Sequence, residues 1–175
     1  MDSDKRRALE LKRTLAALRR ERAQETRIFR EVAPTLCEAG VRFSRIPSSV
    51  CRRALAPLDL VPGKDERLDW SYVPGALCTG WGNLSEAVSI LATAMDSVDA
   101  VRVQVIFHPA LSGLRIKAQD LVQHAKLILG AAYDTLWILP TFEGDWFMEV
   151  ALLDQEVCVA PHGRPAQWAN NDPRS

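Results

Sequence analysis

The sequence predicts an α+β domain that carries a long N-terminal helix, and three observations lead to this class. Helix-forming residues without glycine or proline fill residues 3–32. Amphipathic helical patterns recur at 84–95 and 116–131. Four short apolar segments, three of them in succession near the C-terminus, have the length and composition of strands. We therefore expect a small, mainly antiparallel sheet of about four strands, with helices packed on one face.

The chain is long enough for one compact domain with a full core, because 47% of its 175 residues are hydrophobic. We divide it into a basic helical segment at 1–40, an α+β domain at 41–163 and a polar tail at 164–175. No run of eighteen apolar residues occurs, so no transmembrane helix is expected. The first residues also lack the apolar stretch of a secretory signal. These features lead us to expect a cytoplasmic protein of bacterial type.

The first predicted element is the helix at 3–32, which begins at a capping residue near Ser3 and is limited by Pro34. Apolar residues recur at a three-four spacing in its first half, but the third heptad is polar. An independent coiled coil needs more clean heptads than this. We expect a helix that packs on the domain at one end and projects at the other. A helical hairpin and a dimer contact are alternatives.

The next predicted elements are short. Residues 34–40 extend the helical region, and a short helix occupies 48–57. Residues 70–83 hold three glycines and a proline, which predict an irregular aromatic loop. The helix at 84–95 then begins at Asn83 or Ser85, both of which are good N-cap residues.

Alternating apolar residues predict a half-buried strand at 100–107. One of its faces is apolar, and the other carries Arg102, Gln104, Ile106 and His108. An amphipathic helix at 116–131 follows. Three further strands are predicted at 135–140, 146–153 and 156–160.

Three acids, Glu143, Asp145 and Glu149, lie within seven residues in FEGDWFMEV. The glycine-containing segment TFEGD is typical of a hairpin connection, which would place Glu143 and Asp145 at its tip in water. Glu149 then lies in the following strand and points away from Met148. We interpret the three acids as two turn residues and one strand residue that is solvated or paired, with Arg102 as its partner if the two strands are neighbours.

The sequence lacks the P-loop, dinucleotide-binding, zinc-protease and serine-hydrolase motifs. The four cysteines, at 37, 51, 78 and 158, are too far apart for a closely spaced zinc site. We expect no cofactor and no metal, and buried free thiols rather than disulfides. An enzyme of an unrecognised family would use His108 or Glu149 as general acid or base, but no nucleophile is evident.

Charge is divided unevenly along the chain, although its net value is zero. Residues 1–53 hold 14 basic and 7 acidic side chains, a net charge of +7, and residues 54–175 balance this with −7. A polarised surface favours fast electrostatic association. Together with the missing catalytic motifs, this favours a non-enzymatic protein-binding protein.

One specific version of this hypothesis is an immunity protein that neutralises a cognate bacterial toxin domain. Its acidic part would meet a basic partner, and aromatic residues would anchor the interface. The candidate binding residues are Asp65, Glu66, Asp69, Trp70, Tyr72, Trp81, Glu143, Asp145, Asp154 and Glu156.

The basic helix offers another hypothesis. Its arginines, including Arg13, Arg19, Arg20 and Arg22, could contact a nucleic-acid backbone or an acidic protein. Because acids are interleaved with these arginines, a solvated and salt-bridged helix is a third interpretation.

Overall fold

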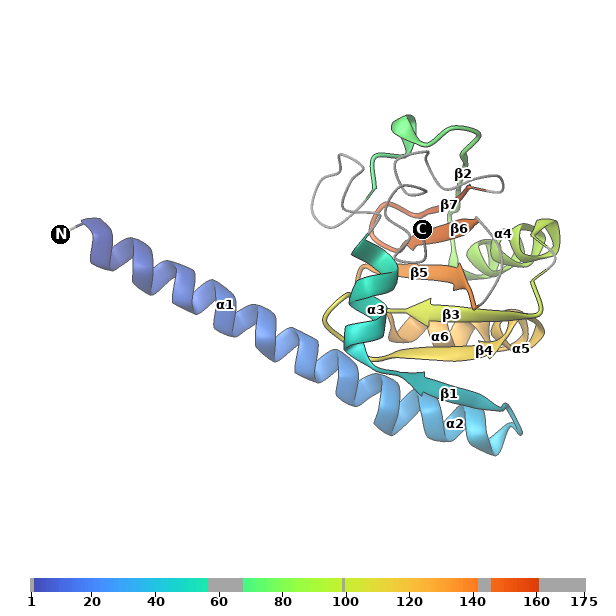
Figure 1. Ribbon diagram of the computed structural model, residues 1–175, viewed down its shortest axis with the longest axis horizontal. Coiled ribbons are helices and arrows are strands. Elements are labelled where there is room, and N and C mark those ends of the chain that lie inside the picture. Colours follow the sequence, from blue (N-terminus) through green and yellow to red (C-terminus); the bar gives the residue numbers. More distant parts are fainter. Residues whose placement is uncertain (1, 57–67, 99, 142–145, 161–175) are drawn as a thin grey trace, which may run out of the picture.

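The computed structural model describes residues 2–56, 68–98, 100–141 and 146–160. Seven strands form one antiparallel sheet in the order β1-β4-β3-β5-β6-β7-β2, so the α+β class is confirmed and the sheet is larger than predicted (Figure 1). The strands are β1 (Phe43–Ile46), β2 (Leu77–Gly80), β3 (Arg102–Ile106), β4 (Gly113–Lys117), β5 (Thr135–Pro140), β6 (Phe147–Ala151) and β7 (Glu156–Ala160). The helices are α1 (Asp2–Arg27), η1 (Ile28–Val32), α2 (Ala33–Glu38), α3 (Ser48–Leu55), η3 (Trp70–Tyr72), α4 (Leu84–Ser97), α5 (Ala118–Gln123) and α6 (Ala125–Ala131).

The long N-terminal helix is confirmed, but Pro34 does not end it. The helix continues from α1 through the π-helical turn η1 into α2. In that turn the Ala33 N–H donates to the carbonyl of Ile28, five residues earlier. Pro34 follows at the start of α2, where the widened turn tolerates a residue without an N–H donor.

The helical run ends at Gly40, whose φ is 77°. The Val41 N–H donates to Leu36 O and the Gly40 N–H donates to Cys37 O, both at 2.9 Å. This is the Schellman arrangement, in which glycine takes the left-handed conformation without a Cβ penalty. Leu36 and Val41 are both buried, so the same turn brings the chain back onto the domain.

Four of the seven strands are those predicted: β3, β5, β6 and β7. The sequence does not predict β1, β2 and β4. Glycines make the β2 region look like a loop, and Ile116 and Lys117 read as the first turn of a helix. In the structure these two residues pair with Val103 and Arg102 of β3. The remainder of the segment forms two helices, α5 and α6, with a break at His124.

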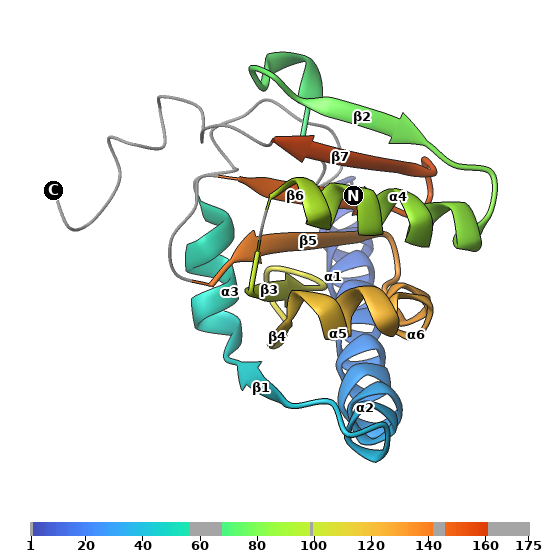
Figure 2. The same cartoon turned by 90° about the vertical axis from the view of Figure 1, so that its right-hand side faces the viewer.

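Helices cover both faces of the sheet, and the prediction of helices on one face is wrong. Figure 2 shows α4, α5 and α6 on one side and α3 on the other. We call the first side the helical face; its core also takes in η1 and α2 through Ile28, Val32 and Leu36. We call the second side the α3 face; its core includes Cys51 and Leu55 of α3 together with Trp70 of η3.

Two local predictions hold for the helices that flank the sheet. The short helix expected at 48–57 is α3, and α4 begins at the expected cap. The Asn83 Oδ1 accepts from the N–H groups of Ser85 and Glu86 at 3.0 and 3.1 Å. Among the described helices, none combines the length and the hydropathy needed to span a membrane.

The cysteines differ from the prediction of buried free thiols. Cys78 and Cys158 form a disulfide between β2 and β7, across 80 residues of sequence. Cys37 and Cys51 are free, and only Cys51 is buried. A disulfide is typical of oxidising compartments or of redox-sensing proteins, so it gives no support to the expected reducing cytoplasm.

Candidate functional site

Glu149 has no exposed surface in the middle of β6, on the α3 face. The Trp70 indole N–H donates to its Oε2, and the Trp70 ring stacks on Phe147 with centroids 4.9 Å apart. The predicted pairing with Arg102 fails because β5 lies between β3 and β6. A buried carboxyl group requires hydrogen-bond donors, and here η3 supplies one. Glu149 therefore has a structural role in fixing η3 to the sheet.

Of the three acids in FEGDWFMEV, the two expected at the hairpin tip, Glu143 and Asp145, lie outside the described residues. Glu149 lies in a strand, as predicted, and its side chain is buried. The Glu149 and Met148 side chains point to different faces of the sheet, as strand alternation predicts, because Met148 belongs to the core of the helical face.

The enzyme hypothesis pairs Glu149 with His108, and the sheet keeps the two apart. Ile106 of β3 is opposite Trp137 of β5, and Trp137 is opposite Glu149 of β6. His108 lies two residues beyond Ile106, where its Nδ1 accepts the N–H of Ala110 at 3.1 Å. In the described part of the chain, no three His, Cys, Asp or Glu side chains are grouped so that they could hold a metal ion.

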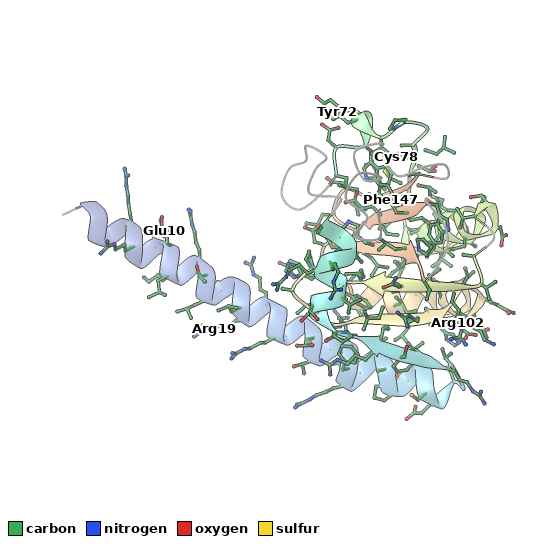
Figure 3. The ribbon with its side chains drawn as sticks, viewed as in Figure 1. Glu10, Arg19, Tyr72, Cys78, Arg102 and Phe147 are labelled. Carbon is green, nitrogen blue, oxygen red and sulfur yellow. A yellow bond between two sulfur atoms is a disulfide. The ribbon has the colours of Figure 1, made fainter. Side chains whose placement is uncertain are left out.

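The three predicted aromatic anchors differ in exposure. Trp70 is buried and already stacked on Phe147, so its ring is not available to a partner. Trp81 is half-buried, and Tyr72 is 63% exposed at the end of the molecule that carries β2 (Figure 3). Of the three aromatic residues, Tyr72 has the most exposed side chain.

The predicted acidic residues are similarly dispersed. Asp154 is exposed and Glu156 is half-buried, both near the β6–β7 connection. Asp69 caps η3, because its Oδ1 accepts the N–H of Ser71 at 3.1 Å. Asp65 and Glu66 lie outside the described residues.

The most distinctive surface is α1, which projects away from the domain over most of its length (Figures 1 and 3). Leu11, Leu15 and Leu18 are 61%, 46% and 44% exposed. Their four-three spacing places them on one side of the helix, which we call the leucine stripe. Leucines are usually buried, and a helix with an apolar stripe usually packs it against another surface. The leucine stripe is therefore a candidate contact.

The leucine stripe has basic neighbours. Helical spacing puts Arg7 before it, Lys12 and Arg19 along one border, and Arg22 at its end. Residues 6–22 carry seven basic and two acidic side chains, a net charge of +5. The opposite side of the helix, which we call the reverse face, carries Arg6, Leu9 and Arg13, and its leucine is 50% exposed.

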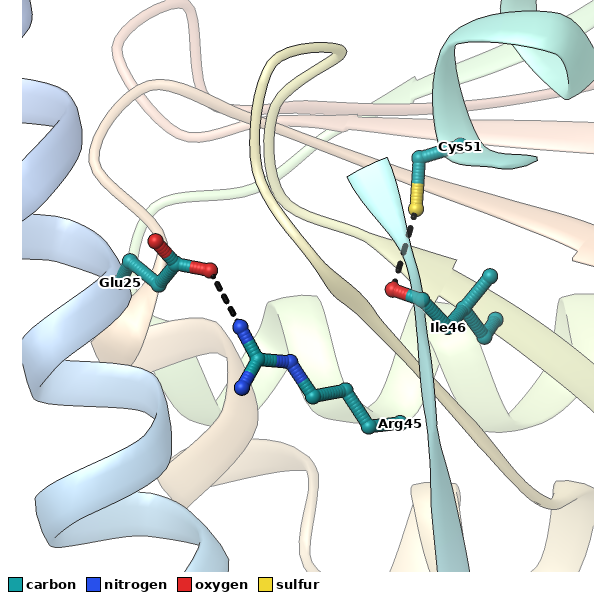
Figure 4. A network of polar contacts seen from close by, with 4 residues as sticks. All are labelled: Glu25, Arg45, Ile46 and Cys51. Atoms are coloured by element: carbon teal, nitrogen blue, oxygen red, sulfur yellow. Dashed lines mark hydrogen bonds and ion pairs between the residues drawn. The ribbon is translucent and has the colours of Figure 1, made fainter. Parts of the chain in front are cut away.

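The described polar and ring contacts between α1 and the domain lie toward its C-terminal end. Arg45 Nη2 lies 2.7 Å from Glu25 Oε1 (Figure 4). The Arg45 guanidinium also lies 4.3 Å from the Phe29 ring centroid. Arg20 lies 6.0 Å from the ring centroid of Tyr133. Among the described residues, no ion pair involves an arginine before Arg27. The Glu21 side chain lies outside the described residues, and the salt-bridged interpretation of the projecting segment stays a prediction.

The four arginines chosen from the sequence thus fall on different sides of α1. Arg19 and Arg22 border the leucine stripe, Arg13 is on the reverse face, and Arg20 approaches Tyr133. The sequence does contain the signal for the stripe, since the three leucines occupy successive heptad positions. The sequence does not show whether these leucines pack on the chain's own domain or remain exposed.

Comparison with models of known protein families and with curated protein sequences finds no match to this chain.

Proposed function

We propose that the chain is a protein-binding protein whose projecting helix α1 docks on an acidic protein partner. The single observation that carries the proposal is the exposed leucine stripe within a basic helix. The described domain does not cover these leucines, and the described ion pairs and ring contacts of α1 begin at Arg20. A helix laid in a groove through residues spaced by three and four is a common mode of protein recognition.

The bordering charges indicate the kind of partner. Lys12, Arg19 and Arg22 would lie at the rim of an interface centred on the leucines. Rim charges contribute mainly to the association rate and to discrimination between partners. A groove with an apolar floor and acidic rims complements this surface. A second copy of α1 would instead bring basic rims against each other.

The test compares two sides of the same helix. A tagged full-length chain is used to recover proteins from a native lysate, with and without nuclease. We expect Leu11→Asp combined with Leu15→Asp to abolish recovery of a stoichiometric partner. Leu9→Asp on the reverse face is the matched control, because it places the same charge on an equally exposed leucine position, and recovery should persist. Equal loss in both variants, or recovery in neither wild type nor variant, would overturn the proposal.

Nucleic acid is the alternative that the arginines favour, and the same helix distinguishes it. A phosphate backbone would be contacted by arginines from both sides, and its binding would weaken steeply with salt. If the partner is a protein, changing Arg19 and Arg22 to Glu should weaken binding much more than changing Arg6 and Arg13 to Glu. Similar losses from the two pairs, with recovery abolished by nuclease, would show that nucleic acid is the partner.

The immunity-protein hypothesis stays a prediction that is carried by the charge division of the sequence. It places the contact with a basic toxin on the acidic part of the domain, at residues such as Tyr72 and Asp154. Tyr72→Ala combined with Asp154→Lys should then abolish recovery, while the leucine-stripe variants should retain it.

A further inference from the structure

The disulfide joins an exposed edge of the sheet to its interior. Cys78 and Cys158 are directly opposite in the β2–β7 register, with Cα atoms 4.1 Å apart. All four residues of β2 are exposed, whereas Cys158 is only 1% exposed. β2 is the last strand of the sheet and pairs with β7 alone (Figure 2). One sulfur thus belongs to an accessible strand, and the other belongs to the core.

The inner cysteine is next to the buried carboxyl group. Glu149 is opposite Cys158 in the β6–β7 register, and Cys158 is opposite Cys78. Directly opposite side chains in an antiparallel pair share a face and have Cβ atoms about 5 Å apart. The row Glu149, Cys158, Cys78 therefore runs from the core of the α3 face to the edge of the sheet.

Residues of this row bind η3 and β2, two consecutive elements of the chain, to the interior strands of the sheet. Trp70 of η3 donates to Glu149, and Cys78 of β2 is bonded to Cys158. Directly after β2, the backbone N–H of Trp81 donates to Gln155 O at 2.8 Å. An edge strand of four residues has few ladder hydrogen bonds of its own, so the disulfide is a principal fastening of β2.

We propose that Cys78–Cys158 is a site of thiol–disulfide exchange with glutathione, and that its reduction releases strand β2 from β7. A glutathione thiolate attacks Cys78 Sγ, forms a mixed disulfide with it, and displaces Cys158 as a thiolate. Cys158 then takes up a proton. A second glutathione thiolate attacks the glutathione sulfur of the mixed disulfide, so that Cys78 leaves and oxidised glutathione forms. Two glutathione thiols are oxidised, and one protein disulfide is reduced to two thiols.

Burial of Cys158 makes reclosure of the reduced pair slow. Cys158 is 1% exposed and lies opposite Glu149, and a site away from water disfavours a thiolate. Because only a thiolate attacks a disulfide, the reduced pair recloses slowly.

The experiment uses the full chain with Cys37→Ala, which removes the exposed free thiol. The protein is equilibrated in buffers whose ratio of reduced to oxidised glutathione runs from that of the endoplasmic reticulum to that of the cytosol. Free thiols are then alkylated and counted by mass spectrometry. We expect the disulfide to open within this range, with amide exchange rising many-fold at 77–82 and staying unchanged in β1. A disulfide that stays closed in the cytosolic buffer overturns the proposal. So does reduction that leaves exchange in β2 unchanged, because either result marks a purely structural bond.

A second variant tests independently whether the disulfide holds β2 on β7. Cys78→Ser combined with Cys158→Ala should show the fast exchange of β2 without any reductant, while α4 and β3 remain protected. If this variant fails to fold, the wild-type titration still decides the question. Slow amide exchange of β2 in a folded variant would show that the disulfide does not hold β2 on β7.

Discussion

The two faces of the sheet are built on different chemistry although they share the same strands. The core of the helical face is an apolar cluster to which η1, α2, α4, α5 and α6 contribute. The α3 face buries Glu149, stacks Trp70 on Phe147, and holds the inner end of the disulfide. A buried indole Nε1 without a hydrogen-bond partner occurs on both faces, at Trp137 on the α3 face and at Trp81 on the helical face. The described polar and covalent contacts of Glu149 and Cys158 thus distinguish the α3 face.

The difference is sharpest between Met148 and Glu149, which are neighbours on β6 and point to opposite faces. Met148 has no exposed surface and packs only in the apolar core of the helical face. Met148→Ala should lower the free energy of unfolding by about 2–5 kcal/mol, because it removes buried contacts and leaves a cavity. Urea denaturation followed by circular dichroism measures this loss. Retention of the wild-type stability would mean that the helical face is loosely packed.

On the α3 face the comparable loss should come from a single hydrogen bond. Trp70→Phe keeps an aromatic ring against Phe147 but removes the indole N–H that Glu149 accepts. We expect a loss of about 1–3 kcal/mol, because the buried carboxyl group then lacks this donor.

A double-mutant cycle separates this hydrogen bond from ring packing. In a Glu149→Leu background the carboxyl group is absent, so Trp70→Phe should cost much less than in wild type. Equal costs in the two backgrounds would assign the effect of Trp70→Phe to packing, and the two faces would then be alike.

The local pattern of apolar residues explains which parts of the fold the sequence predicts. α4 and β3 have regular apolar patterns and β5 is a short apolar run, so each is predicted to within a few residues. Strands β1 and β2 are only four residues long, and the apolar residues of β4 continue into the pattern of the helix that follows, so none of the three is predicted. Glycines at 80 and 113 interrupt two of them further. Pairing with neighbouring strands, which is a long-range property, fixes these segments as strands.

The candidate site is divided in the same way. Spacing alone placed Leu11, Leu15 and Leu18 on one side of a helix, and their exposure depends on where the domain ends. The partner of Glu149 was not predictable, because Trp70 lies 79 residues earlier and belongs to a segment that reads as a loop. Cys78 and Cys158 are likewise 80 residues apart, and no local pattern marks them as a pair.

Two glycines differ in the space that an added Cβ would meet. A Cβ added to Gly113 of β4 would lie 2.6 Å from Val105 O and 3.1 Å from Cys51 Sγ. Gly113→Ala should therefore cost about 1–3 kcal/mol through overpacking beneath α3. Gly130 of α6 has no heavy atom within 4 Å of such a Cβ. Gly130→Ala should stabilise the protein by about 0.5 kcal/mol, because alanine favours the helix.

Thermal unfolding of the two alanine variants, with wild type as reference, gives the comparison directly. The signs should be opposite. A stable Gly113→Ala variant would show that α3 moves away from the sheet without loss, and the close approach of α3 would then have little energetic weight.

A further expected effect is a dependence of stability on pH that belongs to Cys51 of α3. Its Sγ lies 3.8 Å from Ile46 O, beneath the helix (Figure 4). Burial raises the pKa of the Cys51 thiol above its ordinary value of 9.0, and backbone hydrogen bonds to Gly113 and Cys51 partly offset this. Because the pKa is raised in the folded state, the contribution to stability is complete below pH 9.0 and is lost as the pH rises through the folded pKa.

The measurement compares wild type with Cys51→Ala between pH 8 and 10, so that titrations common to both proteins cancel. Cys37→Ala in both backgrounds prevents the exposed thiol from exchanging with the disulfide. Wild type should lose up to about 1 kcal/mol more than the variant over this range, since a thiol in the unfolded chain ionises first. Parallel pH profiles would mean that water reaches the Cys51 thiol, and α3 would then cover its face less completely than the other helices cover theirs.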